Sequence, residues 1–370
     1  MIWDIIIKKY KKDLGASSGV FLLIEFLILQ YYSFIIVLTN KGGEFMTGDR
    51  ISEFFYKRME KALNNMTKDL PEQYKDEPIE ISDEAKLSFI AWGDPQISAL
   101  SPLRSFRVYK ACRDLKNMKK PVDALVLVGD ITEYGAKCEY KMIAELLRPV
   151  YDKFSNFFAV TGNHDIRIRN YKKQKERFKS FINSIPNGQA GENEGYYFSQ
   201  YVNGYKFIML GADTNSFEAS YLSQKQLDWI DSELAETKEG KKPVFVFNHQ
   251  PLKHTNGLPV TFLGRGKWRG SVGNESDKLR AVFEKYDSVV YITGHLHYCT
   301  SQYSYEDCGS FKAISVPTVG VINHGSFKPY TQGYVFEVFD DKIIARSRVF
   351  GEGKYASEEV GNSTIEISLK

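Results

Sequence analysis

Five short segments carry most of the residues that could bind a metal ion. They are Asp94-Pro95-Gln96, Gly129-Asp130, Gly162-Asn163-His164-Asp165, Asn248-His249 and Gly294-His295-Leu296-His297. Each follows an apolar run that predicts a buried strand, and α/β sheets place ligand sites where strands end. Taken singly, each has an ordinary explanation, such as a turn or a helix start. Four of the six histidines fall in these segments, however, and together the segments predict a metal site.

The last of these segments places two histidines two residues apart. We expect a non-extended loop that directs His295 and His297 to one site, and Gly294 permits such a backbone. A lone histidine such as His249 is more often structural than a ligand. The prediction therefore rests on the joint occurrence of the segments.

The rest of the chain supplies elements that can position these segments. Apolar runs at 87–92, 124–128, 157–160, 244–247 and 289–292 predict buried strands, and we expect helices at 103–118, 140–151, 223–234 and 275–286. Residues 197–201 and 205–210 predict a hairpin, and 334–339 and 343–349 predict further strands. This order indicates an α/β fold of two packed sheets flanked by helices, in one domain.

In combination, the five segments resemble the signature of the calcineurin-like metallophosphoesterases, which runs Asp-x-His, Gly-Asp, Gly-Asn-His-Asp/Glu, His and Gly-His-x-His. The resemblance covers about residues 87–300 by motif, and through the trailing strands it extends to 350. It implies a four-layer α/β/β/α sandwich of two mixed sheets, with metal ions at the carboxyl ends of the strands. We therefore place the phosphoesterase domain at 86–350, after a helical lead-in at 46–85 and before a C-terminal tail at 351–370.

The resemblance also implies a role for each site residue. Asp94, Gln96, Asp130 and His297 would hold one divalent metal ion, and Asp130, Asn163, His249 and His295 would hold the other, so that Asp130 bridges the pair. His164 would stand beside the two ions as the catalytic histidine, oriented by Asp165. Outside this set, we expect Glu133 to support the start of the helix after Asp130.

One position departs from the family pattern, because Gln96 stands where the family usually has histidine. A glutamine carbonyl is a neutral and harder oxygen donor, so the preference shifts from Zn²⁺ toward Mn²⁺, Mg²⁺ or Fe²⁺. Some relatives, including manganese-dependent ADP-ribose/CDP-alcohol diphosphatases, also carry glutamine there. We expect manganese first, with iron, magnesium or zinc as alternatives.

The residues themselves support this chemistry. Two divalent ions carry about +4, the carboxylates of Asp94 and Asp130 return about −2, and a bridging hydroxide leaves the centre near +1, which suits an anionic phosphate. Two neighbouring ions lower the pKa of that water and hold the oxygens of an in-line displacement. His164 can protonate the departing alkoxide or stabilise charge on the phosphoryl group.

The expected function is hydrolysis of a phosphodiester or diphosphate bond by attack of the metal-bridging hydroxide. The alternatives are a phosphomonoesterase or protein phosphatase, and a non-catalytic scaffold that retains the fold. All seven ligand positions hold residues able to bind metal, which disfavours the scaffold. The expected partner is a phosphorylated small molecule or nucleotide.

Composition narrows the classes of function. The net charge is +3 over 370 residues, and no basic run interleaved with aromatic residues indicates a nucleic-acid surface. The four cysteines are scattered without a Cys-x-x-Cys pair, which favours reduced thiols over a disulfide framework.

The amino-terminal 45 residues have two interpretations. Residues 20–39 are almost wholly apolar and follow four lysines, as expected for a single membrane span that anchors the protein with its N-terminus in the cytoplasm. Glu25 lies within this stretch and weakens that interpretation. Alternatively, the run 41–46 can be encoded by a purine-rich ribosome-binding sequence ahead of a start codon. Met46 would then be the start of a cytoplasmic protein, and 1–45 translated upstream DNA.

Overall fold

The computed structural model describes residues 77–193, 196–237, 242–262, 269–324 and 331–369. The predicted apolar span at 20–39 and most of the helical lead-in lie outside these residues. Within the described ranges, no helix combines the length and apolar character needed to cross a membrane. Residues 77–86 contain neither helix nor strand.

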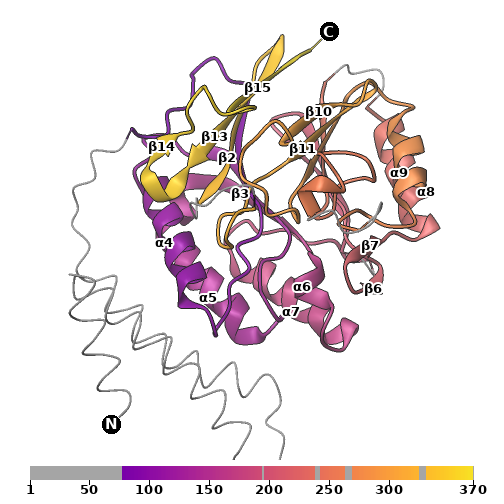
Figure 1. The fold of residues 1–370 in the computed structure, drawn as a ribbon, viewed down its shortest axis with the longest axis horizontal. Helices are drawn as coiled ribbons and strands as arrows, with labels where there is room; N and C mark the ends of the chain where they lie inside the picture. The colour runs from indigo at the N-terminus through magenta and orange to yellow at the C-terminus, as the bar shows by residue number, and fades with distance from the viewer. Residues whose placement is uncertain (1–76, 194–195, 238–241, 263–268, 325–330, 370) are drawn as a thin grey trace, which may run out of the picture. The chain divides into compact units, whose positions relative to one another are not determined.

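Two large sheets form the centre of the fold (Figure 1). The first has the order β14(Lys354–Tyr355), β13(Lys342–Val349), β12(Gln332–Val338), β1(Leu87–Trp92), β2(Val122–Val128), β3(Phe154–Val160), and β15(Thr364–Ser368) also pairs with β13. The second has the order β10(Tyr305–Asp307), β11(Phe311–Ser315), β9(Val289–Thr293), β8(Val244–Phe247), β5(Tyr205–Met209), β4(Phe198–Val202). A small ribbon joins β6(Thr214–Ser216) to β7(Ala219–Tyr221). Both large sheets are mixed, because parallel strands lie beside antiparallel ones in each.

Helices flank the two sheets (Figure 1). Those that follow the strands of the first sheet are α4(Pro102–Lys116), α5(Lys137–Leu147), the short α6(Asn163–Ile166) and α7(Tyr171–Ser184), and those of the second sheet are α8(Gln224–Ala235) and α9(Ser276–Phe283). Short 3-10 helices are η1(Arg148–Lys153), η2(Val260–Phe262) and η3(Phe350–Glu352). Helix α4 starts with proline in its first turn and ends with Arg113 and Lys116, which suit the two ends of a helix.

The main hydrophobic core lies between the two sheets. Phe89 of β1 stacks on Phe336 of β12 at 4.3 Å between ring centroids, and its edge meets Phe207 and Phe245 of the second sheet. A second core packs the outer face of the second sheet against α8 and α9. Because each sheet buries one face against the other and one against helices, the architecture is the predicted four-layer α/β/β/α sandwich.

The expected boundary at residue 350 falls short of the sheet. Ile365 and Ile367 of β15 are buried, and β15 pairs in register with β13 from Thr364 to Ser368. Its alternation of apolar and polar residues is typical of a strand with one covered face. The stretch 351–369 therefore contributes two strands, β14 and β15, to the first sheet and is more than a tail.

Candidate metal centre

The predicted ligands converge from both sheets. Asp94, Asp130 and Asn163 follow the adjacent parallel strands β1, β2 and β3 by two or three residues. His249 and His295 follow the parallel strands β8 and β9 of the second sheet in the same way. The carboxyl ends of parallel strands meet at one edge, so these five positions face a common site.

Five of the predicted side chains form two groups of three with one member in common. One ligand atom each of Asp94, Asp130 and His297 lies within 4.8 Å of the other two, and the same holds for Asp130, His249 and His295. All are buried except His297, whose side chain is 16% exposed. The geometry therefore has the form expected for two adjacent ions with a shared aspartate.

The backbone at the site is left-handed at several non-glycine positions. They are Asp94 (φ 47°), Gln96 (φ 41°), Asp130 (φ 45°), His295 (φ 70°) and His297 (φ 52°). Such residues cost about 1–3 kcal/mol each and persist where the surrounding structure over-determines them, commonly at functional sites. The predicted non-extended loop that carries His295 and His297 is confirmed.

Two glycines allow this crowding. A Cβ atom on Gly129 would lie 2.4 Å from the imidazole Nδ1 of His249, and the glycine itself has φ +80°. A Cβ on Gly294 would lie 2.8 Å from a carboxylate oxygen of Asp94. Each glycine therefore serves the close approach of a loop from one sheet to a ligand from the other.

A backbone contact fixes the ring of His249. Its Nδ1 lies 2.8 Å from the carbonyl oxygen of Val128, an acceptor, so Nδ1 carries a proton and Nε2 faces the site. That Nε2 is 3.2 Å from Asp130 Oδ2 and 3.2 Å from His295 Nδ1. Two unprotonated nitrogens repel at this distance, and either a proton or a cation between them removes the repulsion.

The electrostatics of the site favour positive charge. Burial alone would raise the pKa of Asp130, but the imidazoles of His249 and His164 hold it well below its usual value. Burial alone would lower the pKa of His249, yet the Asp130 and Asp94 carboxylates raise it to about 9. Burial and the neighbouring His249 lower the pKa of His295. The carboxylate of Asp130 is thus ionised and surrounded by imidazole nitrogens, the kind of environment that a divalent cation requires.

Two buried oxygens without hydrogen-bond partners test whether metal ions fit. They are Asp130 Oδ2 and Gln96 Oε1. A buried polar atom that makes no hydrogen bond costs about 1–3 kcal/mol. The contacts of Asp130 Oδ2 are ion pairs with the imidazoles of His249 at 3.2 Å and His164 at 3.9 Å. Both belong to the predicted ligand set, and metal ions fit the residues present.

His164 lies at the side of the two ligand groups. Its backbone N–H donates to Asp130 Oδ1 at 2.8 Å, and its Nε2 is 3.9 Å from Asp130 Oδ2. Its Nδ1 lies 3.0 Å from Arg167 Nη2 and 3.3 Å from Glu133 Oε1. Burial alone would lower the pKa of His164, but the carboxylates of Asp130 and Glu133 raise it.

The predicted contact of Asp165 with His164 is absent among the described residues. Asp165 instead accepts hydrogen bonds from the backbone N–H groups of Ile131, Thr132 and Gly162. The helical turn at 163–166 directs its carboxylate back toward the loop after β2, away from the imidazole. Asp165 therefore holds the loop that carries Asp130, and Glu133 and Arg167 are the polar neighbours of the His164 ring.

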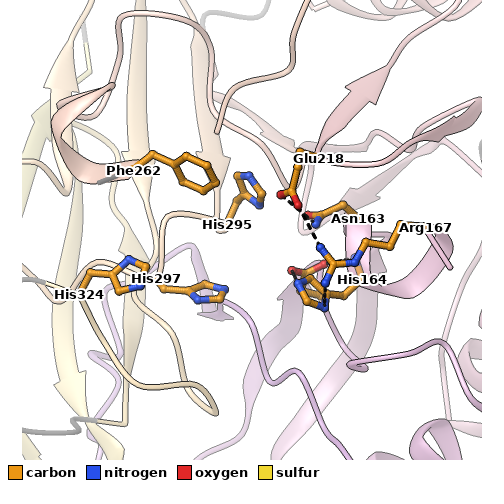
Figure 2. Close-up of a pocket in the computed structure, with 9 residues that line it drawn as sticks. Asn163, His164, Arg167, Glu218, Phe262, His295, His297 and His324 are labelled. Carbon is orange, nitrogen blue, oxygen red and sulfur yellow. Dashed lines mark hydrogen bonds and ion pairs between the residues drawn. The ribbon is translucent and has the colours of Figure 1, made fainter. Parts of the chain in front are cut away.

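A cavity of about 190 Å³ opens onto this centre. It is lined by Asp130, Asn163, His164, Arg167, Glu218, Phe262, His295, His297 and His324. Figure 2 shows Phe262 and His324 on one side, with Arg167, Glu218, Asn163 and His164 across from them.

Four residues outside the predicted ligand and catalytic set shape this cavity. Arg167 pairs with Glu218 at 3.1 Å, and the ring of Phe262 stacks on His295 at 5.2 Å. The Nδ1 of His324 donates to the backbone carbonyl of Leu296 at 2.9 Å, and its ring lies 5.6 Å from that of His297. As a histidine, His324 was a candidate for lining the pocket, and Arg167 could have been found from its position three residues after His164. Nothing in the sequence signals Glu218 or Phe262.

Comparisons with known proteins identify the family. The model of the calcineurin-like phosphoesterases matches residues 89–299. A probable glycerophosphodiester phosphodiesterase of Arcobacter nitrofigilis is 25% identical over 51% of this chain and 62% of its own length. A 3',5'-cyclic-nucleotide phosphodiesterase of Nostoc sp. is 24% identical over 60% of this chain and 72% of its own. The match thus spans less than two thirds of the first relative.

Solved structures agree on the fold. A dimetal phosphatase from Danio rerio superimposes with a TM-score of 0.53 at 15% identity, covering 77% of this chain and all of that one. A purple acid phosphatase from yellow lupin gives 0.54 at 14% identity, covering 76% of this chain and 53% of its own. With the family model matched across more than half of its residues, this chain belongs to the calcineurin-like phosphoesterase family.

Proposed function

We propose that this chain is a metal-dependent hydrolase that cleaves a phosphodiester or diphosphate bond. Asp94, Gln96, Asp130 and His297 would hold one divalent ion, and Asp130, Asn163, His249 and His295 would hold the other. The observation that carries the proposal is the pair of ligand groups that share Asp130, together with the unpartnered ligand oxygens of Asp130 and Gln96.

The donor set favours manganese. Four of the seven ligands, the two aspartates with Gln96 and Asn163, offer oxygen, and the other three offer imidazole nitrogen. Oxygen-rich sites suit Mn²⁺ and Mg²⁺, whereas additional nitrogen or sulfur would favour Zn²⁺. When bound, two such ions would activate water as a nucleophile and neutralise charge on the phosphoryl oxygens.

The protein's own groups complete the reaction. His164 lies beside the two ligand groups, where the carboxylates of Asp130 and Glu133 raise its pKa, and it is the group placed to donate a proton to the departing alkoxide. Arg167 contacts the same ring and presents a guanidinium to the cavity, where it can bind a phosphoryl oxygen. Asn163, which starts α6, faces the cavity with its amide.

Glu218 favours a diester over a monoester. Its carboxylate lines the cavity, pairs with Arg167 at 3.1 Å and lies 3.4 Å from Asn163 Nδ2. A carboxylate there repels the second negative charge of a monoester dianion, whereas a diester carries one charge. The names of the two bacterial relatives, a glycerophosphodiester and a cyclic-nucleotide phosphodiesterase, agree with this preference.

The test is a substrate panel on the full chain loaded with Mn²⁺. We expect faster hydrolysis of bis-nitrophenyl phosphate than of nitrophenyl phosphate. Among natural compounds, we expect activity on a glycerophosphodiester, a cyclic nucleotide or a nucleotide diphosphate. A protein that binds two ions and cleaves only monoesters would replace the diesterase with a phosphatase. A protein that binds two ions and cleaves none of these compounds would support the scaffold.

A further inference from the structure

The side chain of Gln96 is held in one orientation. It is 3% exposed, and its Nε2 donates to Glu133 Oε2 at 2.9 Å. The same Nε2 also lies 3.0 Å from Nδ1 and 3.1 Å from Nε2 of the His164 ring. A carboxylate paired with arginine only accepts hydrogen bonds, so turning the amide over would bring two oxygens together. The contact with Glu133 therefore keeps the amide nitrogen on its side and leaves Gln96 Oε1, which has no hydrogen-bond partner, free as a ligand.

Glu133 is itself fixed on both sides. Arg104 pairs with Glu133 Oε2, and the same guanidinium nitrogen donates to the backbone carbonyl of Gln96 at 3.0 Å. The backbone N–H of Glu133 donates to the carbonyl of Ile97 at 2.9 Å. The loop after β1 and the loop after β2 are thus joined through backbone and side chain at the position of the glutamine.

The second oxygen of the same carboxylate reaches the catalytic histidine. Glu133 Oε1 lies 3.3 Å from His164 Nδ1, and the backbone carbonyl of Glu133 lies 3.1 Å from that nitrogen. A proton on Nδ1 is donated toward Glu133, whereas an unprotonated Nδ1 accepts from Arg167 Nη2 or from Gln96 Nε2, each at 3.0 Å. One residue therefore contacts both a ligand of the first ion and the group beside the ions.

We propose that Glu133 is a positioning residue that selects the oxygen-inward orientation of Gln96. It thereby makes a glutamine effective as a metal ligand where the family usually has histidine. The inference rests on the proposed metal site, because it assigns Gln96 Oε1 to the first ion. Metal ligands depend on outer partners in this way, and removal of such a partner weakens metal binding by roughly 10–100-fold.

The experiment measures metal binding without turnover. The full chain is dialysed against rising Mn²⁺, and bound manganese per chain is measured by elemental analysis. In Glu133→Gln the new amide can donate as well as accept a hydrogen bond. The Gln96 amide can then rotate so that its nitrogen faces the ion. We expect wild type to bind two ions, and we expect Glu133→Gln to bind the first roughly 10–100-fold more weakly with the second unchanged.

Two further variants make the test specific. In the exchanged pair Gln96→Glu with Glu133→Gln, either oxygen at position 96 can face the ion and the amide at 133 can donate to the other, so two-ion binding should return. Glu139→Gln is the matched control, because Glu139 is a buried carboxylate that accepts hydrogen bonds from the backbone of Tyr134 and Ala136 and not from Gln96. Its metal binding should equal that of wild type.

The outcomes separate this inference from the proposed function. Unchanged binding of both ions by Glu133→Gln would overturn the positioning role, even if wild type hydrolyses diesters. Loss of both ions together with a lowered melting temperature would also overturn it, because it would show a structural role. A wild type that binds two ions but is inert would refute the hydrolase and still give the predicted loss in Glu133→Gln. A wild type that binds fewer than two ions would refute both.

Discussion

The two proposed ion sites share Asp130 but differ in how their remaining ligands are held. In the second site the backbone carbonyl of Val128 fixes the ring of His249. In the first site the side chain of Glu133 fixes the amide of Gln96. The backbone carbonyl at the end of a buried strand is fixed by the sheet and is present whatever the side chain. The carboxylate of Glu133, by contrast, can be removed by one substitution. The orientation of His249 in the second site is therefore set by the fold, and that of Gln96 in the first site by neighbouring side chains.

A change to Asp130 should affect both sites equally, because the two sites share this aspartate. Asp130→Asn keeps the shape of the side chain but removes the charge that both sites use. We expect both ions to be lost and hydrolysis to fall by at least about 10⁴-fold, because the two ions supply the nucleophile and most of the charge stabilisation. Bound metal per chain and diester turnover are the measurements.

Asp123→Asn is the matched control for this change. Asp123 lies on the same strand, β2, but at its amino end, where it accepts from the backbone N–H of Ser88. It should keep both ions. If Asp130→Asn retained one tightly bound ion, the shared role of this aspartate would be refuted.

His164 belongs to neither site and should separate chemistry from metal binding. We expect His164→Asn to lower turnover by roughly 10²–10³-fold, because the departing alkoxide loses its proton donor, with two ions still bound. His254→Asn is the control, since His254 is exposed and is not among the residues that line the cavity. Equal turnover of the two variants would contradict the role of His164.

The first site should also respond to a change of ligand while the second does not. Gln96→His replaces an oxygen donor with imidazole nitrogen, so we expect the first ion to shift from Mn²⁺ toward Zn²⁺ by about tenfold in relative affinity. Competition between the two metals, followed by elemental analysis, measures the shift. An unchanged metal ratio would indicate that position 96 does not contact the ion.

The sequence predicted the second site more completely than the first. The ligands that follow a strand by two or three residues are Asn163, His249 and His295 in the second site but, apart from the shared Asp130, only Asp94 in the first. The runs at 87–92 and 244–247 match β1 and β8 residue for residue. A ligand that follows a buried strand is predictable because the strand itself is. The contacts of Glu133 were not predictable, because they depend on how two loops from different strands meet.

Elements with polar buried faces were missed for a related reason. Helix α7 buries Gln174 and Lys175 beside its phenylalanines, so its sequence lacks the apolar stripe that indicates a packed helix. The ribbon that carries Glu218 has strands of only three residues, too short for a recognisable pattern. Strand β15, by contrast, alternates visibly in TIEIS, and that signal could have extended the domain.

The smallest effect should be a pH-dependent change in stability that is due to Glu139. It tests whether the loop after β2, which lies beside the first site, is stable without metal. Burial raises the pKa of Glu139 from 4.5 to about 8. Between these pH values the folded protein keeps the proton and the unfolded chain has lost it, so the free energy of unfolding falls as pH rises from about 4.5 to 8 and levels off above.

Glu139→Gln removes this ionisation. Without metal, the melting temperature of wild type should therefore decline by a few degrees relative to the variant between pH 5 and pH 8. Melting curves of both proteins at four pH values in that range give the difference directly. A constant difference would mean that Glu139 ionises alike in both states, and that the loop opens enough to hydrate its carboxylate. The first site would then depend not only on the orientation of Gln96 but also on a loop after β2 that opens to solvent.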